Sequence, residues 1–295
     1  MNGILIIDKR SGMTSHDVVN RVRRILKIKK VGHTGTLDPF ATGVLVMLVG
    51  KATRLAQFLD KDEKAYEAVV RFGFETDTGD RTGNPRSEAN GQISVTIQEI
   101  ENVLPQFRGE LRQTPPMYSA KKIDGTKLYE HARKGVEIER NPVKINIREL
   151  ELIEPIEIRK HLTVHMRVVC SAGTYVRTLA EDIGRGVGIG AHLQELRRTR
   201  AGGFRIEDAA TLEELEGSGD PFKFLRPMNE AVTHLPEFVL DNDRVEKTLN
   251  GLSTRVERDD LNDGAVRMVN EDGEVVAVGT YSEPERVVRP KIVLM

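Results

Sequence analysis

The 295-residue chain carries 44 Lys and Arg residues against 45 Asp and Glu residues, which gives a net charge of −1. This balance argues against a general nucleic-acid-binding protein, whose surface is usually basic overall. With 39% hydrophobic residues and no long uninterrupted apolar run, we expect a globular protein without a membrane span. The single cysteine, Cys170, excludes an intrachain disulfide and a multi-cysteine metal site, and it favours a reducing, cytoplasmic location.

The first sixty residues predict strands and helices in alternation. The short apolar run "GILIID" (3–8) is typical of a strand. The next segment, "TSHDVVNRVRRILKI" (14–28), repeats apolar side chains at helical intervals, and Thr14 begins a capping-box spacing, so a helix is expected. "VLVMLVG" (44–50) predicts a buried strand because it is short, apolar and bounded by glycines, and "KATRLAQFL" (51–59) predicts a helix.

The middle of the chain predicts further elements separated by a polar loop. "KAYEAVVRFG" (64–73) alternates apolar and polar side chains as a strand does. "ETDTGDRTGNP" (75–85) is a loop, and its acid spacing does not match a calcium-binding loop. "TIQEIENVLPQF" (96–107) predicts a capped helix. The basic, proline-containing segment 112–135 is interpreted either as a mobile arm or as an ordinary connection.

Two strands and a helix are expected in the next part of the chain. "VKINIREL" (143–150) and "HLTVHMRVVC" (161–170) alternate as strands do. "GTYVRTLAEDIGRGVG" (173–188) turns from strand into helix. The glycines of "GVGIGAH" (186–192) do not follow the dinucleotide-binding spacing, so a dinucleotide site is not expected there.

The C-terminal residues predict a small β-rich module. After the linker-like "EGSGDPF" (216–222), a short helix is expected at 243–250. The Asp272-Gly273 dipeptide between two apolar runs predicts a β-hairpin, and "PKIVLM" (290–295) predicts a last strand. A module of about 55–60 residues is small for independent stability, so we expect it to pack on the main domain.

Basic side chains cluster in two runs that contain no acidic residue. "NRVRRILKIKK" (20–30) holds six basic residues and "RRTRAGGFR" (197–205) holds four, while acids concentrate elsewhere, as in 207–220. Each run by itself is explained by a solvent-exposed helix face. The two together favour a polyanionic partner, because local basic patches, and not the net charge, meet phosphate groups.

Asp38 is the only acidic residue in "VGHTGTLDPFATGVL" (31–45), which raises the question of its role. It could cap the turn before Pro39, bind a metal with His33, or act as a nucleophile or base. A cap is ordinary turn chemistry, a metal would require more oxygen ligands, and a reacting carboxylate would require a nearby cation. Three glycines lie within this stretch: Gly32, Gly35 and Gly43. We expect them to let the backbone approach a bulky substrate.

The stretch "GHTGTLDPFATGVLVMLVGKATRLAQFL" (32–59) closely resembles the catalytic motif of the TruB family, the tRNA pseudouridine-55 synthases. Further stretches are similar to the other motifs of that family, in the same order: 3–19, 64–83, 170–184 and 196–204. Together they span most of residues 3–204. An ordered match of this kind is far more specific than any single short motif.

The resemblance implies that Asp38 is the catalytic residue and that Arg177 pairs with it. It implies that Tyr66 stacks on the target base and handles a proton. The reaction of the family detaches uracil from its ribose, rotates it and reattaches it through carbon, without net redox change. Whether Asp38 attacks the sugar, attacks the ring or abstracts a proton stays open at this point.

The resemblance also implies residues that line the pocket or bind RNA. Tyr175 corresponds to a second tyrosine of the pocket, Leu193 to an apolar wall for the base, and His33 to a histidine that holds the RNA loop open. Lys9 supports the catalytic loop. Contacts with the RNA backbone are expected from the two basic runs, and in the first run from Arg23, Arg24 and Lys27.

The implied fold is α/β, of the α+β kind, with a mixed, largely antiparallel central sheet flanked by helices. Residues 1–236 would form the catalytic domain, with an RNA-gripping insertion at about 112–140, and residues 237–295 a PUA-like RNA-binding module. No cofactor and no metal are expected. The expected partner is the T stem-loop of tRNA, bound by a monomer, and a second role in tRNA folding is an alternative.

A related branch of synthases, the dyskerin type, needs guide RNA and partner proteins. That branch has a basic residue after "LDP" and longer charged tails, whereas this chain has Phe40 there and stops at Met295. The sequence therefore favours the stand-alone bacterial type, which uses no guide RNA. A purely non-enzymatic RNA chaperone is the other alternative, and the presence of Asp38, Tyr66 and Arg177 argues against it.

Overall fold

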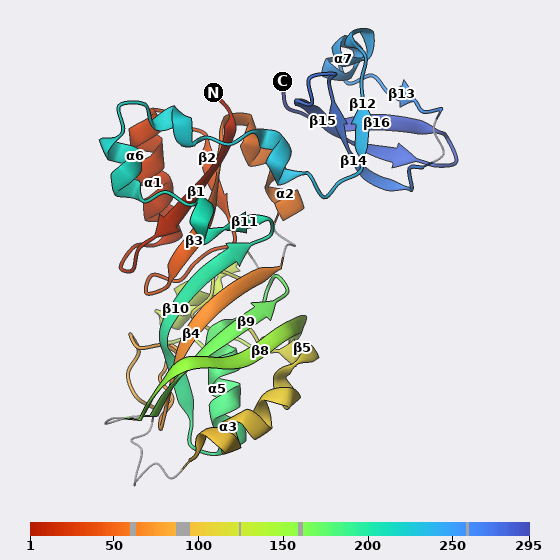
Figure 1. Ribbon diagram of the computed structural model, residues 1–295. Helices are drawn as coiled ribbons and strands as arrows, with labels where there is room; N and C mark the ends of the chain where they lie inside the picture. The colour runs from red at the N-terminus through yellow and green to blue at the C-terminus, as the bar shows by residue number, and fades with distance from the viewer. Residues whose placement is uncertain (60–62, 87–94, 124, 159–161, 258–259) are drawn as a thin grey trace.

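The computed structural model describes residues 1–59, 63–86, 95–123, 125–158, 162–257 and 260–295 (Figure 1). Its main feature is a nine-stranded sheet with the order β1-β3-β10-β4-β9-β8-β5, in which β2 pairs with β3 and β11 with β10. The strands are β1 (Gly3–Lys9), β2 (Val31–Thr34), β3 (Thr42–Val49), β4 (Lys64–Phe72), β5 (Gly109–Gln113), β8 (Val143–Ile158), β9 (Leu162–Cys170), β10 (Ala191–Ala201) and β11 (Phe204–Arg205). Only β3 and β10 pair in parallel among the described strands of this sheet, so the expected mixed, largely antiparallel sheet is confirmed.

Strand β3 is apolar along its whole length because both of its faces are covered. Successive side chains of a strand point to opposite faces. Leu45, Met47 and Val49 belong to one hydrophobic core, and Val44, Val46 and Leu48 belong to a second core on the other side of the sheet. The chain therefore positions the loop before β3, which contains Asp38, against a strand that is fixed on both faces.

Helices flank the large sheet, and two of them begin at caps that the sequence predicts. They are α1 (Ser15–Leu26), α2 (Ala56–Leu59), α3 (Ile97–Val103), α5 (Val176–Val187) and α6 (Leu212–Gly217). Thr14 caps α1 and Thr96 caps α3, each in a capping box. Helix α5 packs on β10, and α3 packs on α5. No helix in the described ranges is both long enough and apolar enough to cross a membrane.

The helix expected at 51–59 forms only in part. A 3₁₀ helix occupies Gly50–Leu55, and the α-helix α2 comprises just the next four residues, Ala56–Leu59. Val49 precedes this segment and provides no side-chain cap. The tighter 3₁₀ turn satisfies orphan backbone groups that a capping side chain would otherwise have bonded.

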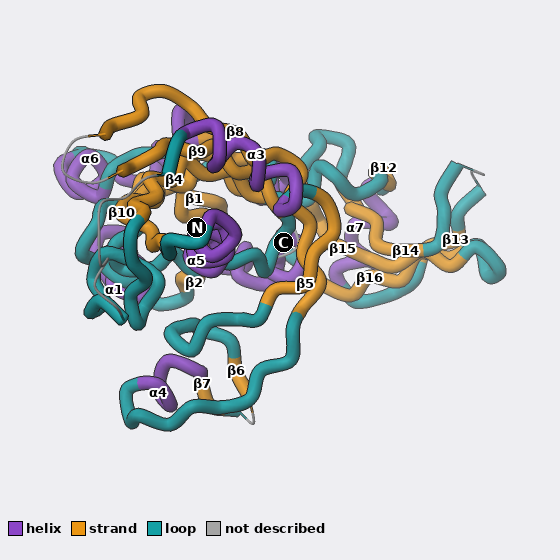
Figure 2. Tube along the Cα trace, turned by 90° about the horizontal axis from the view of Figure 1, so that it is seen from below, coloured by secondary structure: helices purple, strands orange, loops and turns teal. Residues whose placement is uncertain are grey.

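The chain between β5 and β8 projects away from the sheet (Figure 2). It contains a two-stranded hairpin of β6 (Lys122–Ile123) and β7 (Thr126–Lys127), followed by the short helix α4 (Leu128–Ala132). Arg140 closes the base of this segment, since its Nη1 donates to the carbonyl oxygen of Pro115 at 3.2 Å. Lys127 and Arg133 both lie over the ring of Tyr129 within the segment.

A second, five-stranded sheet follows residue 236 and has the order β12-β14-β15-β16-β13. Its elements are β12 (Glu237–Val239), α7 (Asn242–Leu249), β13 (Thr254–Arg255), β14 (Gly264–Val269), β15 (Val275–Ser282) and β16 (Val287–Val293). The hairpin predicted at Asp272-Gly273 joins β14 and β15, and Gly273 has a φ of 78°. Three residues of this C-terminal part, Val278, Ile292 and Leu294, share a hydrophobic core with residues of the large sheet. The expected packing on the main domain is therefore confirmed.

Candidate active site

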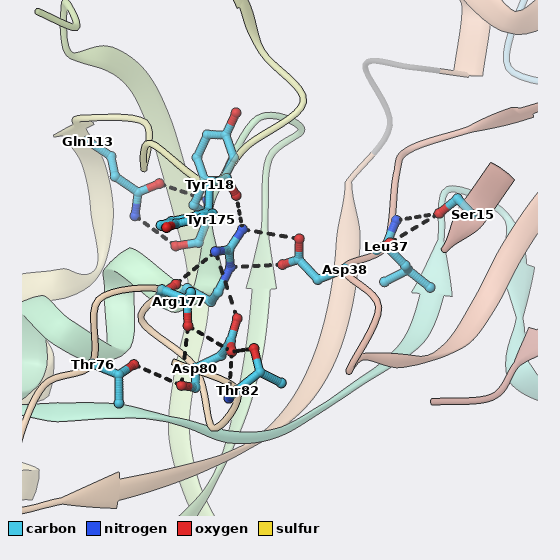
Figure 3. A network of polar contacts seen from close by, with 11 residues as sticks. Ser15, Leu37, Asp38, Thr76, Asp80, Thr82, Gln113, Tyr118, Tyr175 and Arg177 are labelled. Carbon is cyan, nitrogen blue, oxygen red and sulfur yellow. Dashed lines mark hydrogen bonds and ion pairs between the residues drawn. The ribbon is translucent and has the colours of Figure 1, made fainter. Parts of the chain in front are cut away.

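Asp38 lies in the loop between β2 and β3, and this loop is fastened to the start of α1. The Ser15 hydroxyl donates to the carbonyl oxygen of Leu37 at 3.1 Å and accepts from the Leu37 amide at 2.9 Å (Figure 3). The turn that follows closes through the main chain, from the Ala41 amide to the Asp38 carbonyl oxygen. The Asp38 carboxylate points instead to Arg177, so the side chain is an ionic partner and does not serve as a turn cap.

Arg177 is the second residue of α5 and binds Asp38 through two nitrogens. Its Nε lies 2.8 Å from Asp38 Oδ2, and its Nη2 donates to Oδ1 at 3.1 Å. Nη1 donates to the carbonyl oxygen of Thr78 at 2.8 Å and Nη2 to that of Tyr118 at 2.6 Å. The Arg177 side chain is only 5% exposed, whereas the Asp38 side chain is 32% exposed. The cation is therefore enclosed and fixed, while the carboxylate keeps an accessible edge.

The surroundings of Asp38 favour its protonated form more than water does. Burial raises the pKa of the Asp38 carboxyl, and the Arg177 guanidinium opposes that rise. The negative charge of Asp80 raises the pKa further. A carboxylate with a raised pKa takes up a proton more readily than an ordinary aspartate, which suits either a base or a nucleophile held by a cation.

Asp80 is a second buried carboxylate of the site, and it was not among the residues predicted from the sequence. Its Oδ2 lies 3.8 Å from Arg177 Nη1. Its Oδ1 accepts hydrogen bonds from the Thr82 amide at 2.9 Å and the Thr78 hydroxyl at 3.0 Å. Arg177 thus lies between two aspartates, as Figure 3 shows. A signal for this role exists in "TDTGDRTG" (76–83), where threonines two residues before and after Asp80 are spaced to bond its side chain.

Lys9 joins the end of β1 to the loop that contains Asp38. Its side chain is fully enclosed, and its Nζ donates to the carbonyl oxygens of Met13 at 2.8 Å, Arg10 at 3.1 Å and Pro39 at 3.3 Å. Burial lowers the pKa of Lys9 to about 8, and the charge of Asp38 opposes this change. The contact with Pro39, the residue after Asp38, is the arrangement that a supporting role for the loop requires.

The two tyrosines of the predicted pocket come from different elements. Tyr66 is a buried residue of β4; burial raises the pKa of its hydroxyl, and the positive charge of Arg198 opposes that rise. Tyr175 immediately precedes α5. Gln113 fixes the Tyr175 backbone, since it accepts from the Tyr175 amide at 2.7 Å and donates to the Tyr175 carbonyl at 3.0 Å.

Leu193 and Leu196 both lie on β10, next to strand β4, which contains Tyr66. The two leucines differ in their distance from the position opposite Tyr66. In the pairing of β10 with β4, Leu193 lies opposite Val70, Leu196 opposite Ala68, and Arg198 opposite Tyr66. Leu193 is also bonded to the polar loop, because its amide donates to the Gly79 carbonyl at 3.0 Å. With a rise of about 3.3 Å per residue, Leu196 is the nearer of the two to Tyr66.

The basic residues of the first run lie on or just after α1. Arg24 and Lys27 are exposed, whereas Arg23 is half-buried and donates to the Val31 carbonyl oxygen at 2.9 Å. His33 follows on β2, where it pairs with Met47 and is partly exposed. None of these four side chains takes part in the bonded network drawn around Arg177 among the described residues.

The second basic run has a different structure from the one expected. It forms part of β10 and β11, not a helix, and its side chains mostly bond within the protein. Arg197 pairs with Asp8 at 2.7 Å, Arg200 with Glu63 at 2.5 Å, and Arg198 is buried. The alternative of a solvent-exposed helix face is therefore wrong for this run, which lies on strands and is neutralised by acids from segments that are distant in sequence.

Two of the three glycines near Asp38, Gly35 and Gly43, lie close against protein atoms. A Cβ on Gly43, whose φ is +100°, would lie 2.2 Å from the Arg198 carbonyl oxygen. A Cβ on Gly35 would lie 3.1 Å from Lys64 Cε. At Gly32 a Cβ would make only an ordinary contact. Gly43 is required where β3 meets β10, and a substrate contact is not its structural reason.

Metal binding was one of the roles that the sequence left open for Asp38 and His33. In the described part of the chain, no group of three or more His, Cys, Asp or Glu side chains is arranged to hold a metal ion.

Comparison with known proteins places the chain in a family. Residues 23–176 match the TruB family pseudouridylate synthase (N terminal domain), and residues 177–233 match the tRNA pseudouridylate synthase B C-terminal domain. The chain is 42% identical to tRNA pseudouridine synthase B of Solibacter usitatus over 100% of both proteins. It is 44% identical to tRNA pseudouridine synthase B of Geobacillus thermodenitrificans over 94% of both.

Solved structures give the same result. A Cbf5-Nop10-Gar1 complex contains a chain with a TM-score of 0.75 and 30% identity, covering 99% of this chain and 85% of that one. An H/ACA RNP bound to a substrate RNA containing 2′-deoxyuridine gives a TM-score of 0.74 and 28% identity, with 99% and 85% coverage. The fold and the sequence agree, and the chain belongs to the TruB family of pseudouridylate synthases.

Proposed function

We propose that this chain converts the uridine at position 55, in the T loop of tRNA, to pseudouridine, with Asp38 as the reacting carboxylate. One observation carries the proposal: Arg177 is enclosed and holds Asp38 through two nitrogens, while the carboxylate keeps an accessible edge. The substrate class comes from relatives named tRNA pseudouridine synthase B. The position of the uridine comes from the family motif around Asp38.

The chemistry of the reaction fits this arrangement. The product is an isomer of the substrate, so the reaction needs a group that attacks or takes a proton and a charge that orients it. Asp38 supplies the first and Arg177 the second. The planar guanidinium bonds both carboxylate oxygens and so fixes the direction of the reacting edge.

The target base must leave its stack before it can reach Asp38. Flipping a base costs a few kcal/mol, which stacking and hydrogen bonds in the pocket offset. Tyr66 and Tyr175 provide the aromatic surfaces for stacking. Leu196, which lies nearer to Tyr66 than Leu193 does, is the apolar wall of the pocket in this proposal. Leu193 then has a supporting role beneath the polar loop.

RNA would be bound outside the pocket by three parts of the chain. Arg24 and Lys27 expose charge on α1, with Arg23 and His33 close by in the fold. The projecting segment between β5 and β8 has the size and basic character of an RNA-gripping insertion, and the module at 237–295 would bind RNA beyond the T loop. The protein acts as a monomer without guide RNA.

The test is pseudouridine formation in an isolated T stem-loop, with EDTA present and no nucleotide or guide RNA added. We expect a single uridine to be converted, as detected by carbodiimide labelling and primer extension. Asp38→Asn should abolish the product because the amide neither attacks nor takes a proton, while RNA binding persists. Asp182→Asn is the control, since Asp182 lies on α5 but pairs with Arg185. Turnover of Asp38→Asn within tenfold of wild type would contradict the proposal, as would a requirement for guide RNA.

A further inference from the structure

Arg198 is one of the largest side chains that are fully buried, with 1% of its surface exposed. Within the described residues, no carboxylate forms an ion pair with it, whereas its neighbour Arg197 pairs with Asp8. Burying a cation without a counterion is costly unless its donors are all well bonded. The position therefore needs an explanation other than surface charge or a salt bridge.

The Arg198 guanidinium bonds to both ends of the loop that contains Asp38. Its Nε donates to the carbonyl oxygen of Val44 at 2.7 Å, and its Nη2 donates to that of Gly35 at 2.8 Å. Gly35 lies three residues before Asp38, and Val44 lies just inside β3. A Cβ added to Gly35 would lie 3.3 Å from Arg198 Nη1, so the side chain rests directly against the loop backbone.

The same side chain also lies beside Tyr66. Arg198 lies opposite Gly43 on one side and opposite Tyr66 on the other, because β10 runs between β3 and β4. Residues that lie directly opposite on neighbouring strands have adjacent side chains on one face of the sheet. Burial raises the pKa of the Tyr66 hydroxyl, and the positive charge of Arg198 opposes that rise.

We infer that Arg198 is a positioning residue, which holds the Asp38 loop in one fixed relation to Tyr66. The inference rests on the proposed function, in which Asp38 and Tyr66 act on the same flipped base. One rigid, planar group bonds both ends of the loop from a position directly opposite Tyr66, and such preorganisation lowers the barrier when two groups must act at a set separation. A lysine could not span the same acceptors, because its donors radiate from one nitrogen.

The inference is tested by a double-mutant cycle on the full-length protein with the T stem-loop. The variants are Arg198→Met, Tyr66→Phe and the combination of both. We expect Arg198→Met alone to lower kcat by about 100-fold with KM changed by less than about threefold. In the Tyr66→Phe background the same change should lower kcat by less than about tenfold, because the hydroxyl whose position relative to the Asp38 loop matters is already absent.

Equal fold-losses in the two backgrounds would overturn the inference, because a purely structural role does not depend on the Tyr66 hydroxyl. Since Arg198→Met leaves two carbonyl oxygens without a donor, the cycle is repeated with Arg198→Lys, which keeps the charge. The same non-additivity is expected there, with a smaller loss. Arg167→Met is the control, because Arg167 is an exposed arginine of β9 that pairs with Glu151. If Arg198→Met keeps wild-type activity while Asp38→Asn loses it, the inference about Arg198 fails and the proposed function stands. If Asp38→Asn also keeps its activity, the proposed function fails.

Discussion

The interior around Asp38 and the outer face of α1 both contain basic side chains, but they use them in opposite ways. In the interior, the donors of Arg177, Arg198 and Lys9 reach carboxylate or carbonyl oxygens, so the cations fix geometry. On α1, Arg24 and Lys27 are exposed to solvent. Interior cations are therefore expected to control rate and stability, and exterior cations to control affinity for a polyanion.

The two acid-free runs, 20–30 and 197–205, show that a cluster of basic residues in the sequence does not tell whether their side chains fix the interior or face solvent. The first run lies on a helix, where neighbours in sequence share the solvent-exposed face. The second run lies on β10, where alternate residues face opposite sides of the sheet, and acids from β1 and from the residue before β4 approach it. Both runs look alike in the sequence, but Arg197 and Arg200 of the second pair with acids, whereas Arg24 and Lys27 of the first are exposed.

The largest effect should come from the interior cation closest to Asp38. Arg177→Lys should lower kcat by about 100-fold, or ~3 kcal/mol in the barrier, because lysine cannot reproduce the two-nitrogen contact. RNA affinity, measured by filter binding, should stay within about threefold. A variant with wild-type kcat would show that the pairing with Asp38 has no part in the reaction.

A smaller effect should come from burial of the Lys9 charge. The folded protein releases the Lys9 proton at a pKa of about 8, whereas the unfolded chain keeps it up to the ordinary lysine pKa of 10.5. The unfolded state therefore binds more protons in this window, and the free energy of unfolding should rise with pH, by about 1–3 kcal/mol. Urea unfolding of wild type and Lys9→Met, at pH values from about 8 to about 10, measures how the difference between their free energies of unfolding changes with pH. If the free energies of unfolding of wild type and Lys9→Met differed by the same amount at every pH in this range, the prediction would be contradicted.

The exterior cations should change the salt dependence of RNA binding and leave catalysis nearly unaltered. Replacing Arg23, Arg24 and Lys27 together by glutamine should reduce the slope of log affinity against log salt by about 2 to 3. Single-turnover rates at saturating protein should be within about twofold of wild type. An unchanged slope would mean that this face of α1 is only solvated and does not contact phosphate.

The smallest effect is expected for an arginine of the second run. Arg197→Gln removes a pair with Asp8 in which both side chains are partly exposed, so the loss of stability should be about 0.5–1 kcal/mol. The salt slope should not change, because the Arg197 charge is already satisfied by Asp8. A slope reduced by about 1 in this variant would place Arg197 among the phosphate contacts and weaken the distinction between interior and exterior cations.

Local patterns determined much of this protein from the sequence alone. The capping boxes at Thr14 and Thr96, the buried strand β3 and the hairpin at Asp272-Gly273 all follow from residues close together in the chain. The isolation of Asp38 as the one acid in a glycine-rich stretch is likewise visible in the sequence. Such features depend on short-range sterics and hydrogen bonding, which a stretch of about ten residues contains.

Only the tertiary structure decided which charged groups meet. Asp38 and Arg177 are 139 residues apart in sequence, and Asp80 joins them from a third segment. The order of strands placed β10 between β3 and β4, and that placement alone brought Arg198 against both the Asp38 loop and Tyr66. Burial and Coulomb energy depend on distances in space that no local pattern encodes, because they are set by which strands become neighbours when the sheet forms.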